Sequence, residues 1–581
     1  MTMQDVLPQS NAGGLPGTIR SEGRPRMGAW PARLTGGRAG ARAYRPSAWL
    51  VGVSAVVGLL AVVPLAYIVL RASEASPSVW ATLWSSAIPG LLVNTVVLVL
   101  SASGFAALLG LGLAWLVERT DLPGRSVWRW VLALPLAVPA YVGALCYIIL
   151  LRRGGLVEQA FVQGAGLHHG QLPLPPVFGL WGATVVIALF TFPYVFLPVS
   201  AALRSANRAL EEAARVCGRG PWRAFQDATL PLLMPALAVG TLLVSLYVLS
   251  DFGTVALLRY RTFTVAIYNQ FVGQIDRSGA AILSFVLIAM TVPLLAAEAW
   301  FNRRSRRLGI APGSWKPRRL VALGRWRWAA LISVGTVGML SLGLPLLLLG
   351  ALSVQGWLWP TPVDRIWGVG GENLWHYGLN SLVVAGLAAT LATALALAPA
   401  YLIARWGRPV AVVLVALSKA GYALPGLIVG LSLILLFSRW LPALYGTVAV
   451  LVLAFALRFL PQSLATVEAA LRSAPASLEQ AARTMGRGPW QAFREVTLPM
   501  AAPGVAAGWA LVFLTSMKEL PTAILLRPPG FDTLSVRIWA ASSESVYTQA
   551  APPAFLLAAL SVAVLGLLFS RNRFGLDEVV L

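Results

Sequence analysis

Cysteine, histidine and lysine are scarce in this chain of 581 residues. The two cysteines, Cys146 in an apolar run and Cys217 in a polar segment, argue against a disulfide framework and against a cysteine-based metal site. The three lysines, Lys316, Lys419 and Lys518, all lie outside the glycine-rich G-x-x-x-x-G-K-[ST] loop that holds the phosphates of ATP. Metal-ligand spacing and a nucleophile with its base are also absent. The sequence therefore predicts a protein that is not an enzyme and that binds neither a metal nor a cofactor itself.

Charge is scarce as well, at 12% of residues, whereas 57% are hydrophobic and the mean hydropathy is +0.73. Long apolar stretches recur along the chain, which is typical of an all-α polytopic membrane protein embedded in the lipid bilayer. The net charge of +23 comes from arginines in short loops beside these stretches. That pattern follows the positive-inside rule, so it indicates membrane orientation rather than binding of nucleic acid.

The apolar runs divide the chain into two halves with six predicted spans each. Residues 1–47 are rich in Gly, Pro and Arg and predict a disordered basic cytoplasmic tail rather than a cleaved signal peptide. Residues 302–327 are too basic to cross a membrane and predict a cytoplasmic linker between the transmembrane halves 48–301 and 328–581. Both termini are then cytoplasmic. The expected spans lie near 48–70, 88–117, 127–151, 178–203, 233–257, 281–301, 328–354, 379–404, 410–437, 442–468, 500–524 and 552–570.

Two polar segments, 211–235 and 479–503, are nearly the same and are called the duplicated segments below. They are identical at 15 of 25 positions and stand 268 residues apart. Earlier matches, such as Arg119 with Arg405 and Pro139 with Pro425, stand 286 residues apart. The 18 additional residues of the first half fall around 152–176, in a loop that holds His168 and His169, whose role stays open. An even number of spans per half predicts two parallel repeats about an axis along the membrane normal.

Each duplicated segment reads as a short surface helix that a glycine ends, followed by a turn and a Leu-Pro pair before the next span. The alternative is an ordinary amphipathic loop resting on the lipid headgroups. The pattern E-A-A-x-x-x-G with a distal Leu-Pro resembles the EAA motif of permease subunits of bacterial ATP-binding-cassette (ABC) importers. The pattern is carried by Glu212, Ala213, Ala214, Gly218 and Pro231 in the first copy, and by Ala481, Ala482, Gly486 and Pro499 in the second.

This resemblance, over residues 50–575, implies the type I ABC importer permease fold, with about 12 transmembrane helices in the bacterial inner membrane. It also implies two copies of a separate cytoplasmic ATPase that uses the ATP, and a periplasmic substrate-binding protein. The second copy departs from the motif because Gln480 stands where the first has Glu212. The residues expected to dock the ATPase are Glu211, Glu212, Ala213, Ala214, Gly218, Glu479, Gln480, Ala481, Ala482 and Gly486.

Asp251 and Glu519 match at the offset of 268 near the outer part of the fifth span of each half. Ionisable groups at membrane depth are costly, so two repeat-related carboxylates are candidates for a cation path. The alternative is that nearby cations, such as Arg259 for Asp251 and Lys518 or Arg527 for Glu519, neutralise them.

The segments 518–528 (KELPTAILLRP), 531–534 (FDTL) and 550–554 (AAPPA) resemble the fused permeases of ferric-iron importers. Fused permeases for thiamine, polyamine or phosphonate share much of this pattern and stay open as alternatives. An ion-driven secondary transporter is the alternative from another class.

Overall fold

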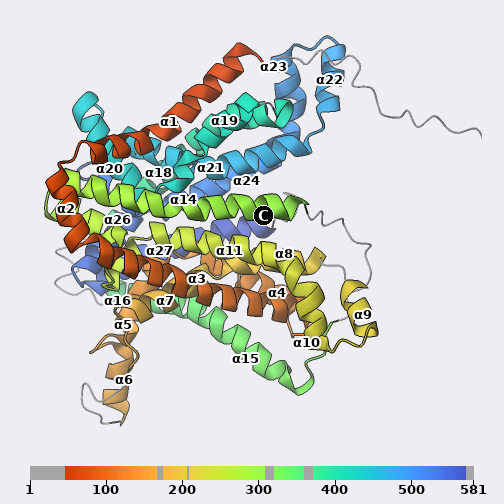
Figure 1. The fold of residues 1–581 in the computed structure, drawn as a ribbon. Helices are drawn as coiled ribbons and strands as arrows, with labels where there is room; N and C mark the ends of the chain where they lie inside the picture. Colours follow the sequence, from red (N-terminus) through yellow and green to blue (C-terminus); the bar gives the residue numbers. More distant parts are fainter. Residues whose placement is uncertain are drawn as a thin grey trace, which may run out of the picture. The chain divides into compact units, whose positions relative to one another are not determined.

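The computed structural model describes residues 46–165, 174–205, 209–307, 320–358, 371–407 and 409–570. Residues 1–45 of the predicted tail, residues 308–319 of the predicted linker and the loop with His168 and His169 lie outside these residues. From Ser47 on, the described part belongs to one compact unit, Ser47–Leu581, and it is built from helices (Figure 1). In this part of the chain, extended pairing is limited to an isolated bridge between Thr120 and Val321.

The first half begins with a long apolar helix, and further long helices alternate with short ones. Its elements are α1 Ala48–Ser73, α2 Pro77–Ser86, α3 Ile88–Arg119, α4 Arg125–Val131, η1 Leu134–Ala137, α5 Ala140–Leu151, α6 Leu156–Ala165, α7 Leu180–Thr191, α8 Pro193–Ser205, α9 Ala209–Val216, α10 Pro221–Ala224, η2 Phe225–Thr229, α11 Leu230–Ser250, α12 Gly253–Leu257, α13 Phe263–Tyr268, η3 Asn269–Gly273 and α14 Arg277–Arg307.

The second half largely repeats this order, which confirms the predicted all-α fold built from two repeats. Its elements are η4 Gly324–Trp326, α15 Arg327–Gly338, η5 Met339–Gly343, α16 Leu344–Leu358, α18 Gly371–Trp406, α19 Pro409–Ser418, η6 Ala420–Ala423, α20 Gly426–Trp440, α21 Val448–Ser473, α22 Ala476–Thr484, α23 Pro489–Ala492, η7 Phe493–Thr497, α24 Leu498–Met517, α25 Pro521–Leu526, α26 Leu534–Ser543 and α27 Tyr547–Ser570.

The number of membrane-crossing helices comes close to the predicted twelve. Ten helical stretches of the described residues are long and apolar enough to cross a bilayer, and the pair α7–α8, bent by 42°, makes eleven. The difference falls on the span predicted near 410–437, which consists of the two shorter helices α19 and α20.

A proline stands at each of these interruptions. A residue before proline is driven out of the helical region, and Leu424 before Pro425 has a ψ of 115°. Val138 before Pro139 has a ψ of 121° at the matching point of the first half. Pro193, which lacks a backbone N–H, lies at the bend between α7 and α8. The third and fourth spans are therefore each built from two helical pieces in the first half.

The first span of each half packs against the third span of the other half. On α1, the Tyr67 hydroxyl donates to Leu435 O of α20 at 3.2 Å, and Ser432 Oγ of α20 donates to Pro64 O at 3.0 Å. Reciprocally, the Tyr147 hydroxyl of α5 donates to Leu340 O of η5 at 3.0 Å. The two halves thus exchange their first spans, as a two-fold arrangement requires.

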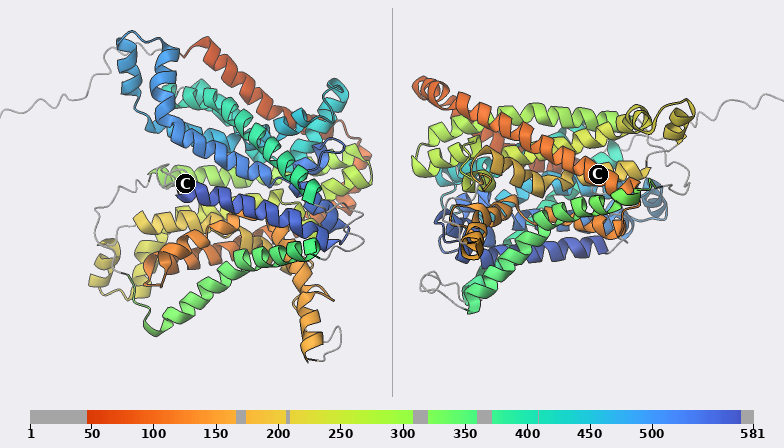
Figure 2. Two further views of the ribbon diagram at one scale, coloured as in Figure 1. Left: turned by 180° about the vertical axis from the view of Figure 1, so that it is seen from behind. Right: turned by 90° about the horizontal axis from the view of Figure 1, so that it is seen from below.

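Both duplicated segments lie at the same end of the helix bundle. Helices α9 and α10 and helices α22 and α23 share this end, while α2 and α6 lie at the opposite end (Figure 1, Figure 2). Beneath the second segment, Phe493 and Ala501 belong to a buried apolar cluster with residues of α1, α18, α19 and α21. The segment therefore rests on the core of its half rather than hanging free.

Candidate functional site

Each duplicated segment folds as the sequence predicts, into a short helix that a glycine ends. In α22, Gly486 has a φ of +88° and donates to Arg483 O, and Arg487 N donates to Ala482 O. In α9, Gly218 has a φ of +81° and donates to Arg215 O. This is the Schellman arrangement, in which a left-handed residue closes the helix and satisfies its last carbonyls. Glycine adopts that conformation without steric strain.

The remainder of each segment is also the same in both copies. A four-residue helix, α10 or α23, follows the turn, and a five-residue π-helical stretch, η2 or η7, runs directly into the core helix α11 or α24. Because the helical backbone is continuous from α10 to α11 and from α23 to α24, a displacement of the surface segment reaches a core helix without an intervening loop.

Glu479 lies inside the protein, although the sequence groups it with the docking residues. Its carboxylate accepts hydrogen bonds from the Tyr401 hydroxyl at 2.5 Å, Arg405 Nε at 3.1 Å and Thr497 Oγ1 at 2.9 Å. The side chains of Glu479 and Arg405 are each 9% exposed. This carboxylate therefore fastens α22 to the end of α18 and to η7. It does not face the surface.

Arg405 completes this fastening from α18. Its Nη1 donates to Leu471 O at 3.3 Å and to Ala474 O at 3.0 Å, at the end of α21. The aligned residue of the first half, Arg119, is also buried. The side chains of Glu211 and Glu212 lie outside the part of the chain that the structure describes.

Other expected docking residues lie at the surface. Gln480, Ala481 and Gly486 are exposed and Ala482 is half-buried, while Ala213 and Gly218 are exposed and Ala214 is half-buried in the first copy. Large apolar side chains surround them. Those with the greatest exposure are Val216 at 88%, Met485 at 84% and Trp490 at 69%. Apolar side chains at such exposure beside a polar helix are typical of an interface that another chain covers.

The two path candidates, Asp251 and Glu519, are both buried and occupy matching positions after α11 and α24. Asp251 accepts from Thr254 Oγ1 at 2.9 Å and from Val255 N at 3.2 Å. Glu519 accepts from Thr522 Oγ1 at 2.7 Å. Each carboxylate thus binds the start of the short helix that follows it.

The cation that pairs with Glu519 comes from α21. Arg458 Nε lies 3.3 Å from Glu519 Oε2. The pairings considered from the sequence do not form, since Lys518 donates to Leu136 O and Arg527 pairs with Asp532. Arg259 likewise lies over the ring of Phe178.

The offset of 286 also matches Asn94 and Thr95 with Asn380 and Ser381, a repetition whose purpose the sequence does not show. Asn94 Nδ2 donates to Arg261 O at 3.1 Å, and Asn380 Nδ2 donates to Asp532 O at 3.0 Å. Thr95 and Ser381 accept from the backbone of Phe263 and Leu534. These bonds hold the chain that follows each path carboxylate against α3 and α18. The signal available in the sequence was that both halves keep an asparagine followed by a hydroxyl residue at these positions.

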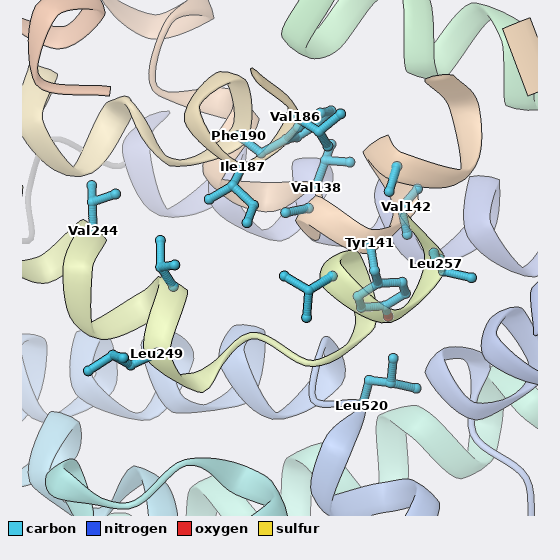
Figure 3. Packing of buried hydrophobic residues seen from close by; sticks show 14 of the residues in the cluster. Val138, Tyr141, Val142, Val186, Ile187, Phe190, Val244, Leu249, Leu257 and Leu520 are labelled. Atoms are coloured by element: carbon cyan, nitrogen blue, oxygen red, sulfur yellow. The ribbon is translucent and has the colours of Figure 1, made fainter. Parts of the chain in front are cut away.

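The two halves meet close to these carboxylates at Tyr141 of α5. Figure 3 shows the Tyr141 ring beside Leu257 of the first half and facing Leu520 of the second. A side chain at Gly253 would come within 3.0 Å of both Tyr141 and Leu520, so the contact between the halves is closely packed. Within the described residues, no group of three or more His, Cys, Asp or Glu side chains is placed to hold a metal ion.

Two repeats of membrane-spanning helices, each with a surface segment continuous with a core helix, define a two-fold transport protein. The family model of the binding-protein-dependent transport system inner membrane component matches the chain twice, over residues 106–307 and 391–573. The chain belongs to this family, as a multi-pass inner-membrane permease with two copies of the domain. Membership implies an ABC ATPase and a periplasmic binding protein as partners, and it disfavours an ion-driven secondary transporter.

Among similar proteins, the Fe(3+)-transport system permease protein FbpB 2 of Haemophilus influenzae is 32% identical over 520 residues, 89% of this chain and 97% of that protein. The molybdenum transport system permease protein ModB of Escherichia coli is 31% identical over 223 residues, 37% of this chain and 94% of that protein. The probable sulfate transport system permease protein cysT of Nephroselmis olivacea is 25% identical over 255 residues, 42% of this chain and 86% of that protein.

Proposed function

We propose that this chain is the permease of an ABC importer for ferric iron, which a periplasmic binding protein delivers to its outer face. The observation that carries the proposal is the extent of the similarity to a ferric permease, which covers both halves and 97% of that protein. By contrast, the similarity to the molybdenum permease covers 37% of this chain. ATP-driven closure of the partner ATPases then rocks the two halves between outward-open and inward-open states.

Two ATPase copies dock on the two duplicated segments. Their position at one end of the bundle supports this arrangement (Figure 2). The exposed Gln480 and Ala481, together with Met485 and Trp490, supply a mixed polar and apolar surface. The ATPase end is cytoplasmic, and so are both termini and the linker, because the arginine-rich stretches follow the positive-inside rule.

The proposal is tested by uptake of radioactive iron into proteoliposomes that contain the permease, its ATPase and the loaded binding protein. Iron should accumulate inside the vesicles only when ATP is supplied on the side of the membrane where the ATPase is bound. Vesicles with a hydrolysis-deficient ATPase are the control. Growth of a deletion strain supplies the second measurement. Rescue by added thiamine or polyamine in place of iron would assign the chain to one of the alternatives from the sequence.

An oxyanion is the second candidate substrate, and a specific observation favours it. The relatives include a molybdenum and a probable sulfate permease. In this chain Arg458, which pairs with Glu519, brings a guanidinium with further N–H donors to the space between the halves. Competition of radioactive iron uptake with molybdate, sulfate and phosphonate separates the two candidates.

A further inference from the structure

A cavity of about 150 Å³ lies between the two halves of the protein. Its walls come from α8, α11 and α14 of the first half and from η6, the start of α20 and α21 of the second. At about 30 Å³ per water molecule, the volume corresponds to roughly five waters. The cavity therefore has room for a small polyatomic ion.

The cavity lies close to the two-fold axis that relates the halves. Tyr194 and Gln462 both line it and occupy equivalent positions, 268 residues apart and each following an aligned proline. Their neighbours are equivalent too. The rings of Tyr194 and Tyr247 are 6.2 Å apart, and Thr515, the counterpart of Tyr247, donates to Gln462 Oε1 at 3.0 Å. A cavity that both members of an equivalent pair line must lie near their common axis, where a central route passes.

Several of the polar side chains that line the cavity carry hydrogen-bond donors. Arg458 is the charged residue among the described residues that line it, and none of these residues is acidic. The Tyr194 and Tyr247 hydroxyls have a proton to donate, and so does the Gln462 amide nitrogen, since Gln462 Oε1 accepts from Thr515. The Ser250 and Thr291 hydroxyls, which also line the cavity, donate to backbone carbonyls of their own helices. A cavity with this lining recognises oxygen atoms that carry negative charge.

Two contacts hold the Arg458 side chain in place, and they use only part of its hydrogen-bonding capacity. Its Nε lies 3.3 Å from Glu519 Oε2, and its Nη1 donates to Leu424 O at 3.3 Å. A guanidinium carries five N–H donors in a fixed plane, so donors are left for the cavity. The aligned residue of the first half is Phe190, which makes this charge specific to the second half.

We propose that the inter-half cavity is a subsite for an oxyanion group, bound by Arg458, Tyr194, Tyr247 and Gln462 as the substrate crosses between the halves. The proposal rests on the proposed transport function and narrows its substrate. The oxyanion is either the solute itself or the anion that accompanies iron in a ferric complex. Iron then passes as an oxygen-rich complex rather than as a bare cation held by Asp251 and Glu519.

The test uses the assembled importer with its ATPase and binding protein in proteoliposomes. The variants are Tyr194→Phe, Tyr247→Phe, Gln462→Leu and the Tyr194→Phe/Tyr247→Phe double change. The matched control is Tyr147→Phe, which removes a tyrosine hydroxyl that lies outside the cavity. Separate arms supply labelled phosphate, sulfate or molybdate alone, and labelled iron on the binding protein loaded with carbonate or phosphate. The readout is the amount of solute imported per ATP hydrolysed.

A hydrogen bond to a charged group changes affinity by roughly ten- to hundredfold. We expect each single variant to lower import per ATP at subsaturating solute by about tenfold, and the double variant to lower it further, with the control within twofold of the parent. If the variants import less free phosphate, sulfate or molybdate per ATP than the parent protein, the oxyanion is itself the solute. The subsite proposal then stands, and the proposal that the chain imports iron fails. Loss in the iron arms alone, to an extent that depends on the accompanying anion, identifies a ferric complex. Iron import that the double variant leaves unchanged overturns the subsite but keeps the transport function.

Discussion

Replacing Glu479 by alanine should release the second duplicated segment from the helices beneath it. The carboxylate accepts three hydrogen bonds, from Tyr401, Arg405 and Thr497, and its side chain is 9% exposed. Removing it leaves the Arg405 guanidinium buried without its counter-charge. Breaking a buried ion pair from one side costs about 3–5 kcal/mol. Helix α22 should then detach while the remainder of the permease stays folded.

Hydrogen exchange of the permease in nanodiscs measures this release directly. A loss of about 3 kcal/mol raises the local opening equilibrium by roughly a hundredfold, so amides of residues 476–484 should exchange correspondingly faster. Gln480→Ala, on the exposed side of the same helix, is the matched control and should leave exchange unchanged. A Glu479→Ala/Arg405→Met pair should cost less than the sum of the single changes, because the two side chains are coupled.

The coupling of ATP hydrolysis to solute import should also depend on the Glu479 carboxylate. Because η7 and α24 continue from the segment, Glu479→Ala should let the ATPase hydrolyse ATP with less solute imported per cycle. If α22 in Glu479→Ala exchanges as slowly as in the parent protein, the carboxylate is not the anchor and this reasoning is refuted.

Three further expectations concern the glycines, the motif asymmetry and the path carboxylates. Gly486→Val should cost about 1–2 kcal/mol locally and lower transport, whereas Gly486→Asn should be tolerated, because φ is +88° and the surroundings are open; equal transport in both variants would show that the turn is unimportant. Glu212→Ala should weaken co-purification of the ATPase more than Gln480→Ala does, because of these two side chains only the Glu212 carboxylate can accept a charge-assisted hydrogen bond as an anion. Equal effects of the two changes would show that the two copies of the motif do not differ in docking. Glu519→Gln should lower the thermal unfolding midpoint more than Asp251→Asn, because it unpairs Arg458; the reverse order in a melting assay would contradict the pairing.

Local chemistry made much of this fold predictable. Most of the spans follow from long apolar runs, and the ends of α9 and α22 follow from Gly218 and Gly486 because helix termination depends on the residue at the turn itself. The break at Pro425 was present in the sequence as a proline. Hydropathy is averaged over a window of many residues, so a single proline does not show in it that a span is divided into two helices.

Partner choice was not predictable, because it depends on distant segments. Arg458 is 61 positions from Glu519, farther along the chain than Lys518 or Arg527, yet packing of α21 brings it to the carboxylate. The partners of Glu479 were not predictable either. In the sequence Glu479 lies in a polar segment typical of the surface, but in the fold Tyr401 and Arg405 of α18 bind its carboxylate. Neither the exchange of first spans nor the inter-half cavity leaves a signal in the periodicity of one segment.

The exchange of first spans makes each half depend on the other. Helix α1 completes the second half and the α15–α16 region completes the first, so neither half is finished by itself. In a homodimer of half-length chains, the same exchange would have each copy lend its first helix to the other. Fusion frees the copies to diverge, which a homodimer cannot do, and Arg458 opposite Phe190 is one outcome of that freedom.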